Sequence, residues 1–325
     1  MIALYCCHYY IVGQYIMKTF FLLLIISCAT VNAFAQGCSD AGFCTMGAMK
    51  PDQPYNKRIA VKLRSMELSF YRGTTKLTPI IYVATADLNF SLNSTSSFQI
   101  KLPYQAVQGK LANTSGVGDI SLCYTRSIYR SDYFDLNMSV GGKIPTNQSN
   151  KSVNDLPLPM YYQTSLGTYD FITGISMINR KWLLATGIQI PLNQNKNAFL
   201  WGAWKNGSED FAYVSKYSKA KELKRGIDVM FRVERNFRFS KFNFSIGLLP
   251  IYRITKDEIT NPIGEREKPK DAQGLALSGI ATFGYNFNVQ SGIKLLVGHR
   301  IVQRNENPDG LTRELVNSIT YNYRF

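Results

Sequence analysis

The stretch Leu311-Thr-Arg-Glu-Leu-Val-Asn-Ser-Ile-Thr-Tyr-Asn-Tyr-Arg-Phe325 decides the fold. Counted back from its end, every second residue is apolar or aromatic: Phe325, Tyr323, Tyr321 and Ile319. The residues between them are polar, and a period of two indicates a β-strand with one apolar and one polar face. A last strand of this kind can pair with the first strand and close a barrel, which leaves no free edge. The sequence therefore predicts an all-β fold, a single antiparallel transmembrane β-barrel.

The same alternation recurs in about twelve segments along the chain. We expect strands at Arg58–Tyr71, Ile81–Leu92, Ser97–Gln105, Gly118–Tyr129, Tyr133–Pro145, Thr168–Asn179, Lys181–Leu192, Gly226–Arg238, Lys241–Arg253, Leu275–Asn288, Gly292–Val302 and Leu311–Phe325. In the first of them the phase slips near Arg64 and Ser65, which predicts a β-bulge. A soluble β-sandwich would also alternate and is the alternative. Here, however, charge recurs on the polar face and aromatic residues recur at the strand ends, as a membrane barrel requires.

The connections support a barrel independently of the faces. Long polar links are expected at 146–167, 193–225 and 254–274. The links after every second strand are short, at 93–95, 130–132, 180, 239–240 and 290–291. Short turns on one rim and long loops on the other are typical of outer-membrane barrels, with the short turns in the periplasm.

The N-terminal region predicts export. Met17-Lys18 is a short basic start, residues 20–26 form an apolar core, and Ala33-Phe34-Ala35 fits a cleavage site, so residues 1–35 read as a signal peptide. Residues 1–16 are then an over-extended start. A membrane anchor and lipidation of Cys28 are the alternatives. We expect a periplasmic lead-in segment at 36–56, tucked under or into a barrel that spans 57–325, and a location in the bacterial outer membrane.

Three cysteines follow the predicted cleavage site. Cys38 and Cys44 can close a small disulfide loop in an oxidising periplasm. A metal or redox site is the weaker alternative, because no histidine or further cysteine lies close to them in the sequence. Cys123 is expected in a strand as a small side chain.

The formal net charge is +15, which raises the question of a nucleic-acid partner. An exported chain with dispersed basic residues argues against that class. The charges expected in the lumen are Lys62, Arg64, Asp87, Lys101, Asp119, Asp135, Lys143, Asp170, Asp228, Arg232, Glu234, Arg253, Lys294, Arg300 and Arg324. They predict a self-compensating network that fills the barrel or, as the functional alternative, a mildly positive pore that favours anions. The loop cluster of Lys216, Lys219, Lys221, Lys224 and Arg225 is expected to pair with outer-membrane lipid phosphates.

The sequence contains no HExxH, P-loop, paired CxxC or GxSxG motif, and we expect no enzyme activity, no cofactor and no metal. His299 follows the predicted signal peptide and shares the face of Leu295 and Val297, so it is expected to point to lipid near the outer rim. An outer-membrane lipase built on this histidine is a distant alternative.

Three further stretches resemble outer-membrane barrels of the MetA-pathway-of-phenol-degradation family. They are Ser115-Gly-Val-Gly-Asp119, Gly142-Lys-Ile-Pro-Thr146 and Leu166-Gly-Thr-Tyr-Asp-Phe171, and the resemblance covers roughly the central third and the closing strand. That family is related in architecture to fatty acid and toluene transporters. The resemblance implies passage of small, apolar or aromatic molecules.

These observations lead to two main hypotheses. The first is a passive outer-membrane channel or transporter for small solutes. The second is a non-transporting barrel whose extracellular loops bind a partner, motivated by the loop 193–225 with its aromatic residues Trp201, Trp204, Phe211 and Tyr213. In either case the terminal strand resembles the signal that the bacterial barrel-assembly machinery recognises.

Overall fold

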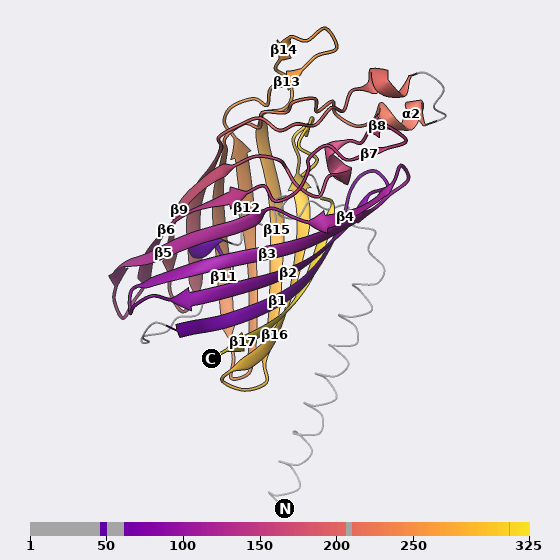
Figure 1. The fold of residues 1–325 in the computed structure, drawn as a ribbon. Coiled ribbons are helices and arrows are strands. Elements are labelled where there is room, and N and C mark those ends of the chain that lie inside the picture. The colour runs from indigo at the N-terminus through magenta and orange to yellow at the C-terminus, as the bar shows by residue number, and fades with distance from the viewer. Residues whose placement is uncertain (1–45, 51–61, 206–209, 312) are drawn as a thin grey trace, which may run out of the picture. The chain divides into compact units, whose positions relative to one another are not determined.

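The computed structural model describes residues 46–50, 62–205, 210–311 and 313–325. In this part of the chain twelve antiparallel strands form a closed barrel, as predicted (Figure 1). The strands are β1 (Lys62–Thr74), β2 (Ile80–Ser91), β3 (Ser96–Gln108), β5 (Ile120–Arg130), β6 (Asp135–Ile144), β9 (Asp170–Ile178), β10 (Trp182–Pro191), β11 (Asp228–Arg238), β12 (Phe242–Arg253), β15 (Gly274–Asn286), β16 (Ser291–Val302) and β17 (Leu315–Arg324). No helix among the described residues is long and apolar enough to cross a membrane.

The ring closes between its first and last strands. β17 pairs with β1, which places Ile319 opposite Phe70 and Tyr321 opposite Leu68. These four side chains are 42–49% exposed, so the apolar face of the seam points outward. The apolar face of the strands therefore points outward, as expected of a membrane barrel. Outward apolar side chains meet lipid, and every hydrogen bond between strands stays within the sheet.

A bulge interrupts the first strand at the predicted position. The β1–β2 register shifts between Leu63, which pairs with Phe90, and Ser65, which pairs with Asn89. Arg64 is therefore an extra residue between an outward and an inward position. A bulge of this kind re-aims side chains, and here both Arg64 and Ser65 line the interior.

Aromatic side chains collect at the rim of the short turns. Ring pairs stand 4.9–5.4 Å apart, centroid to centroid, at Tyr129 and Phe134, Phe242 and Tyr285, Tyr285 and Phe287, and Tyr323 and Phe325. Aromatic rings with polar tips favour the boundary between lipid and water. They mark the lipid–water boundary at the short-turn rim of the barrel.

The long connections fold into small elements at the opposite rim. These are β4 (Asn113–Val117), the pair β7 (Ser152–Val153) and β8 (Leu156–Pro157), η3 (Met160–Tyr162), η4 (Trp201–Trp204), α2 (Phe211–Val214), and the pair β13 (Ile259–Thr260) and β14 (Arg266–Glu267). They share a buried apolar cluster, which we call the loop core, with members such as Leu158, Tyr162, Phe199, Trp204 and Tyr217. The loops at this rim are therefore packed structures with a core of their own.

Candidate functional site

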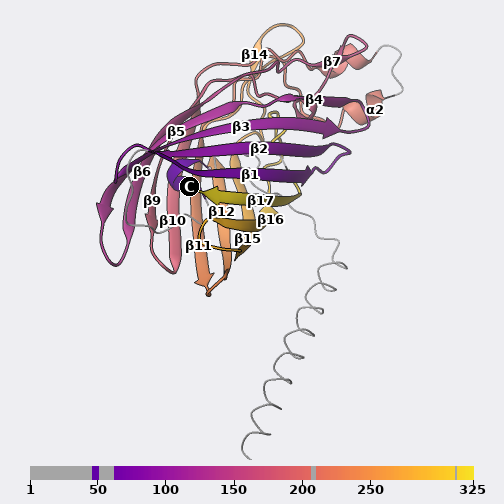
Figure 2. The same ribbon diagram turned by 60° about the horizontal axis from the view of Figure 1, so that its bottom comes forward.

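A short segment of the chain lies inside the barrel. Met46–Lys50, here called the lumen segment, contains the turn η2 (Gly47–Met49) and contacts β5, β6, β9 and β10. Figures 1 and 2 show it as a short indigo stretch within the ring of strands. Met46 and Met49 are buried at 1% and 0% exposure, so the segment fills the space that an open pore would leave to water.

Two glycines of the wall make room for this segment. A Cβ atom added to Gly187 would come within 2.1 Å of the Met49 sulfur, and one added to Gly174 within 2.9 Å. Because these glycines pair across β9 and β10, they form a shallow cradle for the thioether. Gly47 itself adopts φ +47°, a conformation that L side chains rarely adopt.

Polar contacts hold the segment from the opposite side. The Gly47 amide donates to the Gln99 side-chain oxygen at 2.7 Å, and the Gln99 amide group donates to Asp87 at 2.8 and 3.0 Å. The Lys50 ammonium lies 2.8 Å from Glu67 and 3.3 Å from Asp87. Burial disfavours the charged form of Lys50, but these two carboxylates outweigh it and raise the pKa of Lys50 above its ordinary value.

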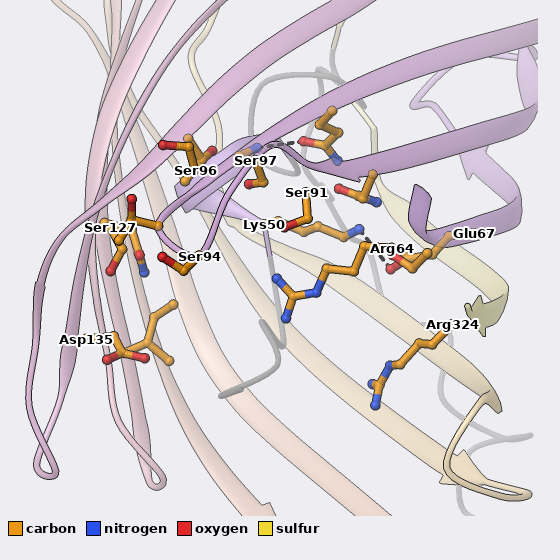
Figure 3. Close-up of a pocket in the computed structure, with 18 of the residues that line it drawn as sticks. Lys50, Arg64, Glu67, Ser91, Ser94, Ser96, Ser97, Ser127, Asp135 and Arg324 are labelled. Atoms are coloured by element: carbon orange, nitrogen blue, oxygen red, sulfur yellow. Dashed lines mark hydrogen bonds and ion pairs between the residues drawn. The ribbon is translucent and has the colours of Figure 1, made fainter. Parts of the chain in front are cut away.

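Between the segment and the short-turn rim lies a cavity of about 350 Å³, which we call the vestibule (Figure 3). Its wall includes the basic side chains Lys50, Arg64, Arg130, Lys294 and Arg324 and the acidic side chains Glu67 and Asp135. Hydroxyl and amide groups cover much of the remainder, from Ser65, Asn89, Ser91, Asn93, Ser94, Thr95, Ser96, Ser97, Gln99, Thr125, Ser127, Asn137, Gln290 and Asn322. The vestibule is therefore polar, and its basic residues outnumber its acidic ones.

A smaller cavity of about 90 Å³ lies further along the lumen. Lys101, Asp119 and Lys143 line it, together with residues of the long-loop rim such as Leu166 and Arg313. Asp119 accepts hydrogen bonds from the Ser165 hydroxyl and from the Leu166 amide, the latter at 3.0 Å. The carboxylate of Asp119 thus holds a loop against the wall.

Seven buried charges form a network at the long-loop rim. This rim network consists of Arg225, Arg253, Arg304, Asp170, Asp228, Asp257 and Asp309. Arg253 is its centre, 1% exposed, with its guanidinium donating to Asp228, Asp257 and Asp309 at 2.7–2.8 Å. Because four of the seven residues come from loops, the network fastens the loops to β9, β11 and β12.

Two loop carboxylates of the rim network differ in their proton affinity. Burial opposes ionisation of Asp309, but the positive charges of Arg253, Arg304 and Arg225 outweigh it and lower the pKa of Asp309. Burial raises the pKa of Asp257, against the pull of Arg253. Asp309 therefore favours the charged form of the network, and Asp257 opposes it.

The aromatic residues of the 193–225 loop point largely into the loop core. The Trp204 indole is 3% exposed and donates to the Pro157 carbonyl at 2.9 Å, and the Trp201 indole donates to the Tyr217 carbonyl at 2.8 Å. Tyr213 bonds through its hydroxyl to Tyr217 at 2.7 Å and also to Thr78. Trp204 thus belongs to the loop core, and Trp201, Phe211 and Tyr213 pack against that core while staying partly exposed.

The remaining predicted residues are spread over the barrel. The side chain of Lys62, the disulfide candidates Cys38 and Cys44, and the signal peptide lie outside the described residues. Arg232 and Glu234 form a buried pair within β11, and Arg300 lies 3.1 Å from Glu314. The Cys123 thiol is buried in β5.

Arg225 corrects one expectation. It is 3% exposed and bonds to Asp170 at 2.8 Å, so it is not available to lipid phosphates as the loop-cluster interpretation assumed. Sequence reasoning also missed Lys50, Glu67, Asp257 and Asp309. Of these only Glu67 lies in a strand, and its inward direction could have been read from the bulge, which shifts the parity of β1.

His299 lies on the outer face in an apolar groove whose lining includes Trp182, Val233, Leu248 and Gly279. The lining of this groove contains no serine, aspartate or asparagine that could complete a hydrolytic site with the imidazole. The described environment of His299 therefore does not favour a lipase.

Comparison with known proteins gives a likeness of fold. No family model matches the sequence, and no curated protein matches it either. Among solved structures, the COG4313 outer membrane channel from Pseudomonas putida F1 superposes with a TM-score of 0.57 at 12% identity, over 84% of this chain and 99% of that one. The NanC porin gives a TM-score of 0.46 at 6% identity over 81% of this chain and 100% of that one. The likeness to the COG4313 channel shows that the chain has the fold of an outer-membrane β-barrel.

Proposed function

We propose that the protein is an outer-membrane channel for the passive passage of small polar solutes, with the lumen segment and the rim network as its closures. The observation that carries this proposal is the polar lumen. A closed barrel with an apolar outside encloses a polar vestibule of about 350 Å³, within the size range of small-molecule sites. The likeness of fold to the COG4313 channel supports the same class of function.

Solute polarity follows from the lining. The family resemblance implied apolar or aromatic solutes, for which an apolar path would be needed. The vestibule instead offers hydroxyl, amide and guanidinium groups, and such groups favour solutes that can replace the hydrogen bonds of water. We therefore propose polar solutes as the class that passes.

Liposome swelling tests this function. Proteoliposomes with the purified protein should swell faster than empty liposomes in isosmotic solutions of small sugars or salts of organic acids. Equal swelling rates for protein-containing and empty liposomes with every charged, neutral and apolar probe would refute the proposal. Heat-modifiable migration on gels provides the control that the reconstituted barrel is folded.

A further inference from the structure

The vestibule has a local excess of positive charge that its own carboxylates leave uncompensated. Arg64 of β1 and Arg324 of β17 both point into the cavity (Figure 3). Among the described residues, neither guanidinium has a carboxylate within ion-pair distance. Arg64 instead lies near the like charges of Arg324 and Arg130. Like charges brought together in a half-buried site are unfavourable unless an anion joins them.

The acidic side chains of the vestibule lie near basic residues other than Arg64 and Arg324. Glu67 lies 2.8 Å from the Lys50 ammonium and also interacts with Lys294. Asp135 stands opposite Arg130 in the β5–β6 register. The two unneutralised guanidinium groups are therefore those of Arg64 and Arg324.

The bulge of β1 creates this arrangement. Without the extra residue, strict alternation would turn Arg64 to the outer face, because Ser65 and Glu67 already point inward. With it, Arg64 and Ser65 both face the cavity, and Ser65 pairs directly with Arg324 across the seam. Bulges are frequent beside functional sites because they re-aim a side chain in this way.

Neutral hydrogen-bonding groups surround the two guanidinium groups. Asn89, Ser91, Ser94, Asn322 and Gln290 line the same cavity. A planar guanidinium fork matches the oxygens of a carboxylate or phosphate, and hydroxyl and amide groups match the hydroxyls of a sugar or polyol. The site thus combines recognition of an anionic group with recognition of a hydroxylated body.

We propose that the vestibule binds a small hydroxylated solute through its carboxylate or phosphate group, held between Arg64 and Arg324. The inference deepens the proposed channel function, since it names the class of solute that the periplasmic end of the lumen takes. Binding at this site requires no flux, so it can be tested separately from passage.

Calorimetry on the detergent-purified full-length protein at low ionic strength tests the site. Sodium gluconate and inorganic phosphate serve as the anionic probes, and glucose serves as the neutral hydroxylated probe. Gluconate or phosphate should bind at one saturable site, glucose should bind at least about tenfold more weakly, and added salt should weaken the anion. Binding of only one anion would identify the group that the site selects.

Two substitutions locate the site. Arg64→Gln and Arg324→Gln should each weaken anion binding by about tenfold or more, because each removes a charge-assisted contact. Arg72→Gln is the matched control, since it makes the same change in β1 on the face shared by the exposed Leu68 and Phe70. If Arg324→Gln prevents folding, Arg64→Gln and the salt dependence of the native protein carry the test.

The inference is overturned if neither anion binds saturably, if glucose binds as tightly as gluconate, or if folded Arg64→Gln keeps the native affinity. These results differ from failure of the channel function. A protein that binds gluconate without accelerating liposome swelling would retain the site and lose the proposed passage. A protein that accelerates liposome swelling without binding either anion would support the proposed passage and refute the anion site.

Discussion

Replacement of Arg253 by alanine is the sharpest test of how the long-loop rim is held. Arg253 makes five hydrogen bonds to three carboxylates at 2.7–2.8 Å, including a two-pronged contact with Asp228. It is 1% exposed, so water does not replace these bonds when the guanidinium is removed. The alanine variant leaves Asp228, Asp257 and Asp309 as buried carboxylates without their central partner.

The loss of stability in the alanine variant depends on the cations that remain near the three carboxylates. Breaking a buried ion pair by removing one partner costs about 3–5 kcal/mol of stability. Here Arg225 stays 3.7 Å from Asp228 and Asp309, and Arg304 stays 3.8 and 3.7 Å from the same two carboxylates. These two cations compensate in part, so we expect Arg253→Ala to lower the free energy of unfolding by about 3 kcal/mol.

Urea unfolding of the barrel in detergent micelles, followed by tryptophan fluorescence and by heat-modifiable migration, measures this loss. Arg253→Lys keeps the charge but loses the fork, and should fall between the native protein and the alanine variant. Arg235→Ala is the control, because Arg235 stacks on Trp182 at 4.9 Å on the outer face, and it should cost about 1 kcal/mol or less. A loss below about 1 kcal/mol for Arg253→Ala would refute the reasoning.

Three further predictions concern the closures of the lumen. Lys50→Ala removes the ion pairs that tie the lumen segment to Glu67 and Asp87, and Gly187→Ala places a methyl group against the Met49 sulfur. Both variants should increase the rate of liposome swelling with a neutral sugar. Unchanged rates would show that the segment does not obstruct the path. The lowered pKa of Asp309 adds stability that is present above about pH 4 and lost below it, so Asp309→Asn should make the urea midpoint fall less steeply in acid. The raised pKa of Asp257 has the opposite effect, so Asp257→Asn should make the midpoint fall more steeply. Equal declines in the native protein and both variants would contradict this assignment. Trp204→Ala removes a buried indole from the loop core at a cost of about 3–5 kcal/mol of stability. The 192–227 connection should then become sensitive to protease, while the barrel keeps its heat-modifiable migration. Full protease resistance of the loop would count against a shared core.

The wall of the barrel was predictable from the sequence because each strand carries its own signal. Alternation in β17 gives its faces from ten consecutive residues, and no distant partner is needed to see it. The bulge at Arg64 was visible for the same reason, since a break in period is as local as the period itself. The short turns followed from the ends of neighbouring strands.

The contents of the lumen were not predictable in this way. Asp257 and Asp309 lie in loops, where no period indicates a direction, and each meets Arg253 only because the barrel brings their loops together. Lys50 precedes the first strand, so nothing local shows that its ammonium reaches Glu67. The alternation of each strand predicts which charged residues face the lumen. Which of these charges form ion pairs with each other depends on tertiary contacts between separate elements.

The position of the lumen segment makes its insertion a separate step in the assembly of the barrel. Met49 packs against glycines of β9 and β10, while Lys50 bonds to β1 and β2, so residues before the first strand contact both halves of the wall. The seam between β1 and β17 is the last pairing that the chain order allows. Met46–Lys50 therefore reaches the lumen either before that seam forms or afterwards through an end of the closed barrel. A barrel that closes without this segment leaves Glu67 and Asp87 without the Lys50 ammonium and leaves the glycine cradle of β9 and β10 without the Met49 thioether.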